Sequence, residues 1–161
     1  MVKDFYRVEF VEEEDPDEPF LEGVTDLRRK LIEIYPYGGE HLDITLGHET
    51  AHTMGKKHSS LRDTPSEALR HVYLEEVDSE IQSVLWAREY GTLTKSDLRH
   101  AESHIGKLLA SWIKGGLPKG EFLDYLRNSE VSDSSIRRIN SLGSKYYRIS
   151  DYWSDPSAYE D

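Results

Sequence analysis

Residues 30–54 read KLIEIYPYGGEHLDITLGHETAHTM, a strand pattern followed by a helix pattern. The segment from Lys30 to Tyr35 is rich in apolar and β-branched side chains, which is typical of a strand. Pro36 to Gly39 ends that strand with turn-forming residues. A helix is then predicted from about Glu40 to Met54, and Gly55 is a natural helix terminator.

Further helices are predicted along the rest of the chain. Thr64-Pro65-Ser66-Glu67 is a strong helix start, because Thr64 can cap the helix and Glu67 completes a capping box. That helix should run to Glu89 or Tyr90. The other predicted helices start at Thr94-Lys95-Ser96-Asp97 and stop at Gly115-Gly116, run from Lys119 to Arg127, and run from Asp133 to Ser141.

The N-terminal part is predicted to contain strands. Asp4 to Val11 reads as a strand, and residues 12–19 form an acidic loop with two prolines. Residues 1–39 are therefore strand-rich, residues 40–143 helical, and residues 144–161 a tail. The fold class is α+β, as one domain over residues 1–161. Tyr146, Tyr147, Tyr152 and Trp153 in the tail are expected to pack onto the body.

Composition restricts the classes of function. The 161 residues include no cysteine, so disulfides and thiolate metal sites are excluded, and metal ligands must be His, Asp or Glu. The net charge of −11 disfavours nucleic-acid partners. No apolar run reaches the length of a membrane span, and Met1 to Asp4 lacks the layout of a signal peptide. A cytoplasmic protein without membrane partners is expected.

His48-Glu49-Thr50-Ala51-His52 matches the H-E-x-x-H pattern. Residues four apart share one face of a helix, so both imidazoles point the same way and can bind two corners of a zinc tetrahedron. Glu49 can accept a proton from zinc-bound water, whose pKa the metal lowers toward roughly 7. This set predicts a zinc-dependent peptidase with a peptide or protein substrate. Two imidazoles and a carboxylate also suit iron or manganese.

With this motif on a predicted helix after a strand, the segment from Lys30 to Tyr90 resembles the zincin metallopeptidases. The resemblance implies that the strand from Lys30 to Tyr35 lines the cleft and pairs with the substrate backbone. His48 to His58 also matches the longer H-E-x-x-H-x-x-G-x-x-H pattern of metzincins, which implies His58 as third ligand. Metzincins have a methionine turn, however, and this chain contains only Met1 and Met54.

The favoured third ligand is Glu76 on the next helix, with His58 as the alternate. Glu76 and Glu80 fall within its apolar stripe, where unpaired carboxylates are costly unless a metal or cation is near. Glu76 would ligate zinc, and Glu80 would accept the other ring N–H of a ligand imidazole. This spacing resembles gluzincins, and Leu74 to Ala87 is similar to the ImmA/IrrE-like peptidases. The stripe is formed by Leu69, Val72, Tyr73, Val77, Val84 and Ala87.

Other interpretations remain open. Glu76 and Glu80 could instead form ion pairs with Arg70, Arg88 or Lys107. The whole chain could be a catalytically inactive zincin-fold module that binds or regulates proteins, or a helical interaction protein without metal. His100 and His104 also lie four apart, but no Glu follows His100, so they are read as ordinary helix residues. The candidates for stabilising an oxyanion are Tyr35, Tyr37, Tyr73, His71, His100 and His104.

Overall fold

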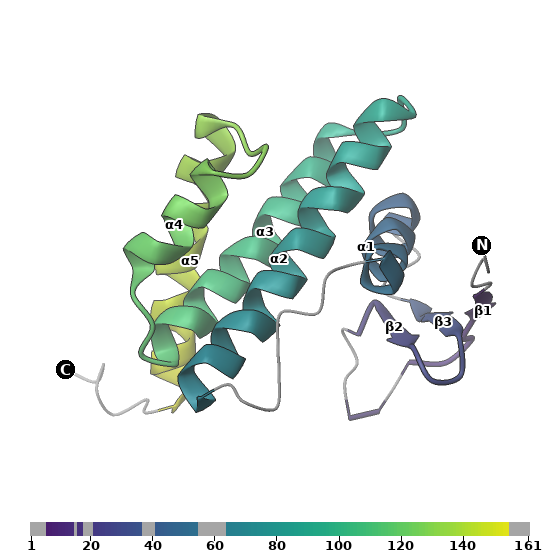
Figure 1. Ribbon diagram of the computed structural model, residues 1–161, viewed down its shortest axis with the longest axis horizontal. Coiled ribbons are helices and arrows are strands. Elements are labelled where there is room, and N and C mark those ends of the chain that lie inside the picture. Colours follow the sequence, from purple (N-terminus) through teal and green to yellow (C-terminus); the bar gives the residue numbers. More distant parts are fainter. Residues whose placement is uncertain (1–5, 15, 18–20, 37–40, 55–63, 155–161) are drawn as a thin grey trace. The chain divides into compact units, whose positions relative to one another are not determined.

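The computed structural model describes residues 6–14, 16–17, 21–36, 41–54 and 64–154, and it describes side chains up to residue 149 (Figure 1). Within these residues, three short strands precede five helices, which confirms the α+β class. None of the described helices is long and apolar enough to cross a lipid bilayer. The elements are β1 (Arg7–Phe10), β2 (Gly23–Asp26), β3 (Leu31–Ile34), α1 (Leu42–Met54), α2 (Pro65–Glu89), α3 (Lys95–Lys114), α4 (Lys119–Arg127) and α5 (Asp133–Ser154).

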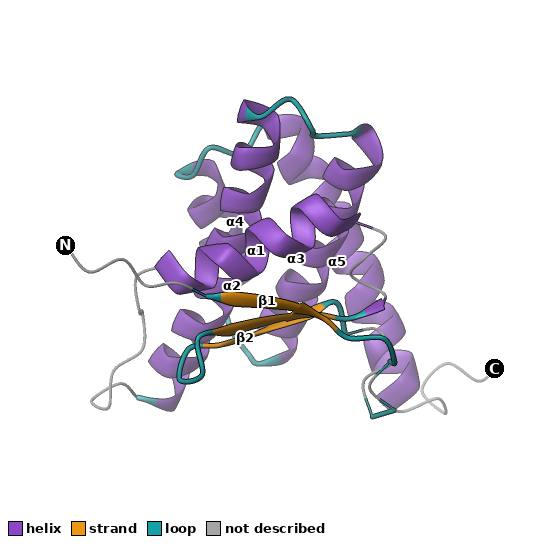
Figure 2. Ribbon diagram, turned by 90° about the vertical axis from the view of Figure 1, so that its right-hand side faces the viewer, coloured by secondary structure: helices purple, strands orange, loops and turns teal. Residues whose placement is uncertain are grey.

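The three strands form one sheet in the order β1-β3-β2 (Figure 1), and Figure 2 shows this sheet in orange beside the purple helices. β1 is parallel to β3, with Arg7 opposite Leu31, and β2 is antiparallel to β3, with Val24 opposite Glu33. β3 is the central strand, and its apolar residues Leu31, Ile32 and Ile34 are buried. β2 was not predicted from the sequence, since its four residues, GVTD, begin with Gly and end with Asp, which are both rare in strands.

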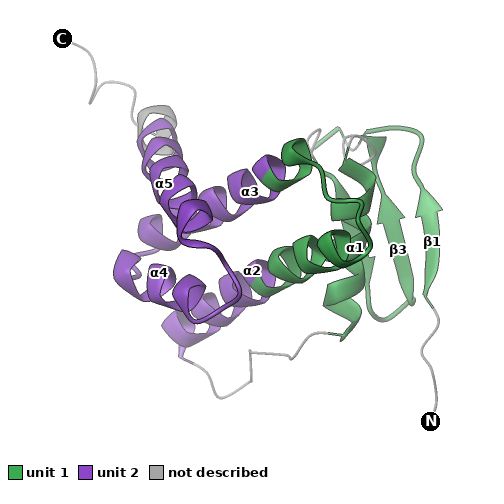
Figure 3. Cartoon of the chain, turned by 90° about the horizontal axis from the view of Figure 1, so that it is seen from above, with its two compact units in different colours: residues 1–56, 78–98 green, residues 57–77, 99–161 purple. Residues whose placement is uncertain are grey.

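The chain divides into two compact units (Figure 3). Unit 1 comprises residues 1–56 and 78–98, and its core includes Leu31, Ile34 and Ile44. Unit 2 comprises residues 57–77 and 99–161, and its core is centred on Trp112. α2 and α3 each contribute residues to both units. The expectation of a single domain over residues 1–161 stays a prediction.

The capping box predicted at Thr64 and Glu67 is confirmed, and the helix start predicted at Thr94 to Asp97 has the same arrangement. At α2, the backbone N–H of Glu67 donates to Thr64 Oγ1 (3.2 Å), and the N–H of Thr64 donates to the Glu67 carboxylate (3.1 Å). At α3, Thr94 and Asp97 exchange the same two bonds, at 3.0 and 3.3 Å. The predicted bounds of α4 are also confirmed.

The last helix is longer than predicted. α5 continues from Asp133 to Ser154, so the predictions of a stop at Ser141 and of a tail from residue 144 are wrong. Gly143 does not end the helix, because it serves close packing: a Cβ there would lie 2.6 Å from Leu109 Cδ2 on α3. Tyr146 packs on α3 as expected, with its hydroxyl 2.5 Å from Ser103 Oγ.

Three of the predicted tail aromatics have other outcomes. The side chain of Tyr147 is exposed, so the expectation that it packs onto the body is wrong. Those of Tyr152 and Trp153 lie outside the described side chains.

Glycines 120 and 143 provide a matched pair of stability predictions. Gly120→Ala in α4 should raise the free energy of unfolding by about 0.4–1 kcal/mol, because the new Cβ meets no atom within 4 Å and the unfolded chain loses freedom. Gly143→Ala should lower it by about 1–3 kcal/mol through overpacking against Leu109. Urea unfolding of both variants measures the difference, and a stabilised Gly143→Ala protein would contradict the packing described.

Candidate metal centre

The two histidines of the motif converge on one face of α1. His48 and His52 lie one helical turn apart, and their Nε2 atoms are 3.0 Å from each other. The rings meet edge to face, with centroids 4.7 Å apart. His48 is buried, with 6% of its surface exposed, and His52 is half-buried. α1 therefore presents two imidazole nitrogens to one point, as the four-residue spacing predicts.

The opposite nitrogens of both rings are held by α2. His48 Nδ1 lies 2.6 Å from the Oε2 atom of Glu80, whose side chain is 2% exposed. Because a carboxylate only accepts hydrogen bonds, the proton of the neutral His48 ring is on Nδ1, and Nε2 is an acceptor. His52 Nδ1 lies 3.3 Å from Ser79 Oγ. The contact predicted for Glu80 is present, and its role beside a metal stays a prediction.

This arrangement suits a cation between the rings. The acceptor atom Nε2 of His48 faces Nε2 of His52, so either His52 donates an Nε2–H to His48 or a cation lies between two lone pairs. Zinc ligands at about 2.0–2.1 Å in a tetrahedron are roughly 3.3 Å from one another, close to the separation observed. The Glu80 carboxylate would hold the ligand ring in orientation, which is the usual partner of a metal-bound histidine.

Glu76 completes a possible ligand set. One ligand atom each from His48, His52 and Glu76 lie within 4.8 Å of one another, and they are the only such group among the described residues. Glu76 is half-buried and precedes Glu80 by one turn of α2. α2 is a continuous helix across the boundary at residues 77 and 78, so the helix itself fixes the spacing of Glu76 from Ser79 and Glu80.

A close contact between α1 and α2 brings these side chains together. A Cβ on Gly47 would lie 2.9 Å from Ser83 Cβ and 3.2 Å from Ser83 Cα, so only glycine fits at this position. Gly47 immediately precedes His48, and Ser83 follows Glu80 by three residues. Sequence reasoning did not identify Gly47, although a glycine inside a helix is unfavourable by about 1 kcal/mol and is a signal for close packing.

Glu49, the second residue of the motif, points toward the sheet rather than toward α2. Its side chain is 7% exposed, and its carboxylate accepts a short hydrogen bond from the Thr25 hydroxyl on β2. Thr25 Oγ1 also lies 2.9 Å from the main-chain oxygen of Glu49. Thr25 was missed from the sequence, because β2 was not recognised as a strand and the two residues are 24 positions apart.

Several other predictions have a definite outcome. The strand from Lys30 to Tyr35 is not available to a substrate, because β3 is hydrogen-bonded to β1 on one side and to β2 on the other; that prediction is wrong. Val72 is 53% exposed and does not belong to the apolar stripe of α2. His58, the alternate third ligand, and Tyr37 lie outside the described residues.

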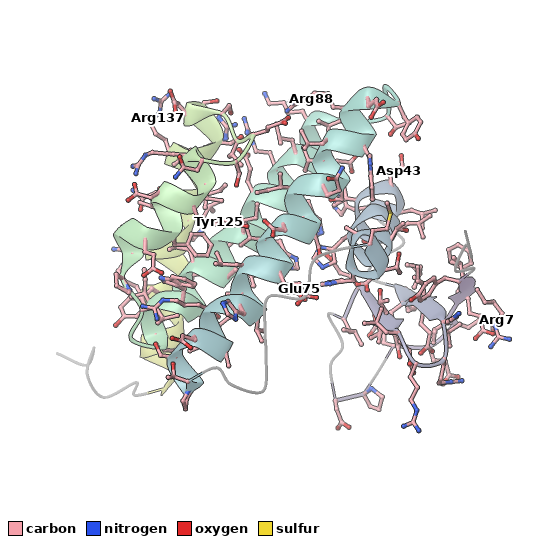
Figure 4. The ribbon with its side chains drawn as sticks, viewed as in Figure 1. Arg7, Asp43, Glu75, Arg88, Tyr125 and Arg137 are labelled. Atoms are coloured by element: carbon pink, nitrogen blue, oxygen red, sulfur yellow. The ribbon has the colours of Figure 1, made fainter. Side chains whose placement is uncertain are left out.

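The three basic residues considered as ion-pair partners of Glu76 and Glu80 have the following contacts and positions. Arg70 donates to Glu121, at 2.9 and 3.3 Å. Lys107 lies over the ring of Tyr146, 5.7 Å from its centroid. Arg88 lies at the C-terminal end of α2, three turns beyond Glu76 (Figure 4).

Among the remaining candidates, Tyr73 packs edge to face on Trp112, with ring centroids 6.3 Å apart. His100 and His104 lie on α3 and are not part of the group that could hold a metal.

Comparison with protein-family models, with curated proteins and with solved structures finds no match for this chain.

Proposed function

We propose that this protein is a zinc-dependent peptidase. The observation that carries the proposal is the pair of facing Nε2 atoms of His48 and His52, with the Nδ1 atom of His48 bound to the buried Glu80 carboxylate. Such a pair needs a proton or a cation between its rings, and Glu76 offers a carboxylate oxygen at the same point. Ligand type and number match a catalytic zinc site with two histidines and one glutamate.

In the proposed reaction, His48, His52 and Glu76 would hold the ion, with His58 as the alternate third ligand. When bound, zinc supplies a Lewis acid and a water of lowered pKa. Glu49 would act as the general base toward such a water and as the acid toward the leaving amine. Glu80 would keep Nε2 of His48 available to the ion by accepting a hydrogen bond from Nδ1–H. Iron or manganese would use the same ligands.

We further propose that the substrate peptide lies along β2. Both sides of β3 are already paired, whereas β2 is an edge strand among the described residues. The face of β2 that carries Thr25 contacts Glu49, so a peptide on this edge would pass close to the base. An extended peptide can add to such an edge through backbone hydrogen bonds.

Zinc content tests the proposal. Tag-free protein loaded with zinc and freed of excess metal should contain about one zinc per chain by elemental analysis. His48→Ala and His52→Ala should lose nearly all of it, because each removes one of only a few protein ligands.

The matched control is His100→Ala with His104→Ala, since these histidines have the same spacing on α3 but do not belong to the group. Their zinc content should equal that of the wild type. Wild-type protein without stoichiometric zinc, or equal loss in both pairs of variants, would overturn the proposal.

A further inference from the structure

One hydroxyl group holds the carboxylate of Glu49. Thr25 Oγ1 is the donor of a short hydrogen bond to Glu49 Oε2, and its single proton also faces the main-chain oxygen of Glu49, 2.9 Å away. Among the residues that the structure describes, no other side chain hydrogen-bonds this carboxylate. The bond is half-buried, where a hydrogen bond to a charged group is stronger than in water.

The neighbouring position on the same face of β2 leaves space for that carboxylate. Residues two apart on a strand point to the same side, so positions 23 and 25 both face Glu49. A Cβ on Gly23 would lie 3.1 Å from Glu49 Cγ and 3.3 Å from Glu49 Oε1. It would also lie 3.1 Å from the main-chain oxygen of Glu33 on β3, so it has little room to move away. β2 thus binds one carboxylate oxygen, and at position 23 it places no side chain against the other.

We propose that Thr25 is a positioning residue for the general base, and that Gly23 provides the space in which Oε1 faces the reacting water. This inference rests on the proposed peptidase function. A free glutamate side chain samples several rotamers, and only those within hydrogen-bond reach of the water are productive. By holding Oε2, Thr25 selects one of them before the substrate arrives. A misplacement of about 1 Å is enough to lower a rate about 100-fold.

The variants Thr25→Val and Thr25→Ser test the inference on the zinc-loaded full chain. Valine has the shape of threonine without its hydroxyl, and kcat for a peptide substrate should fall about 10- to 100-fold. KM and zinc content should stay at the wild-type values, because the Thr25 hydroxyl bonds Glu49 and no metal ligand, and a peptide added to the edge of β2 would pair with the backbone of that strand, which valine keeps. Serine restores the hydroxyl, so Thr25→Ser should keep kcat close to that of the wild type.

The outcomes separate this inference from the function on which it rests. If zinc-loaded wild-type protein hydrolyses no peptide, the proposed function fails. If the wild type is active and Thr25→Val has an unchanged kcat, Thr25 does not position the base. If serine fails to rescue an active, zinc-containing protein, or if KM rises while kcat is kept, the hydroxyl is not the group responsible, and the inference is likewise overturned.

Discussion

Replacing Glu49 with glutamine should stop peptide hydrolysis while zinc stays bound. Glutamine keeps the size of glutamate and can still accept a bond from Thr25, but it cannot take a proton from water. Because general base catalysis contributes about 10²- to 10⁴-fold, kcat should fall by that factor. Cleavage of a fluorogenic peptide mixture and elemental analysis of the same sample measure the two quantities together.

Glu89→Gln provides the control, since Glu89 is an exposed acid at the end of α2 and its loss changes the net charge equally. Its kcat and zinc content should match the wild type. Full activity of Glu49→Gln would show that Glu49 is not the base. A zincin-fold module that only binds proteins would show zinc in both variants, with no hydrolysis even by the wild type.

The second large effect concerns a buried ion pair in unit 2. Glu102 on α3 is 2% exposed and accepts two bonds of 2.9 Å from Arg138 Nε on α5 and one of 2.7 Å from Arg99. Arg138→Leu leaves this carboxylate buried without the charge and the hydrogen bonds of Arg138. The free energy of unfolding at pH 7 should fall by about 2 kcal/mol, less than the roughly 3–5 kcal/mol of a fully buried pair, because Arg138 is 35% exposed and Arg99 remains.

The same pair predicts how this effect depends on pH. Burial alone would raise the pKa of Glu102, but the bonds from Arg138, Ser135 and Arg99 outweigh it and lower the pKa below the ordinary 4.5. A carboxyl with a lowered folded-state pKa stabilises the protein fully above its unfolded pKa, and this stabilisation disappears as the pH falls through the folded value. The difference between wild type and Arg138→Leu should therefore shrink in acid, below pH 4.5.

Urea unfolding of both proteins at neutral and at acid pH measures this dependence. Arg127→Leu is the control, because Arg127 pairs with Asp124 on the surface and its loss should change stability little. A difference between wild type and Arg138→Leu that stays constant down to strongly acid pH would contradict the role given to Glu102.

Local patterns predicted the helices well and the sheet only in part. The starts of α2 and α3 follow from Thr64 and Thr94, because a capping box is decided by four consecutive residues. β3 was found because its apolar residues are contiguous. β2 is a strand through its pairing with β3, which lies later in the chain and leaves no mark on the sequence of β2 itself. Gly143 was misread because its partner, Leu109, belongs to another helix.

The residues of the candidate site likewise fall into those that the sequence identified and those that it did not. His48 and His52 converge because they lie four residues apart on α1. Glu80 is buried because it falls within the apolar stripe of α2. Thr25 and Gly47 act through neighbours in other elements, so no spacing within the sequence points to them. His58 fits the motif pattern and lies outside the described residues, so the choice between it and Glu76 stays a prediction.

The contact of Gly47 with Ser83 has a consequence for protein engineering. Metal affinity is usually altered by exchanging ligands, which also changes the chemistry of the centre. Here the distance between α1 and α2 can be changed without exchanging a ligand. A methyl group at position 47 would push Ser83 away and move Glu80 away from His48. Removing the Ser83 side chain would take away the contact at 2.9 Å but not the one at 3.2 Å with Ser83 Cα, so substitutions at positions 47 and 83 would compensate each other in part, and the affinity of the proposed zinc site could be adjusted with its ligands left in place.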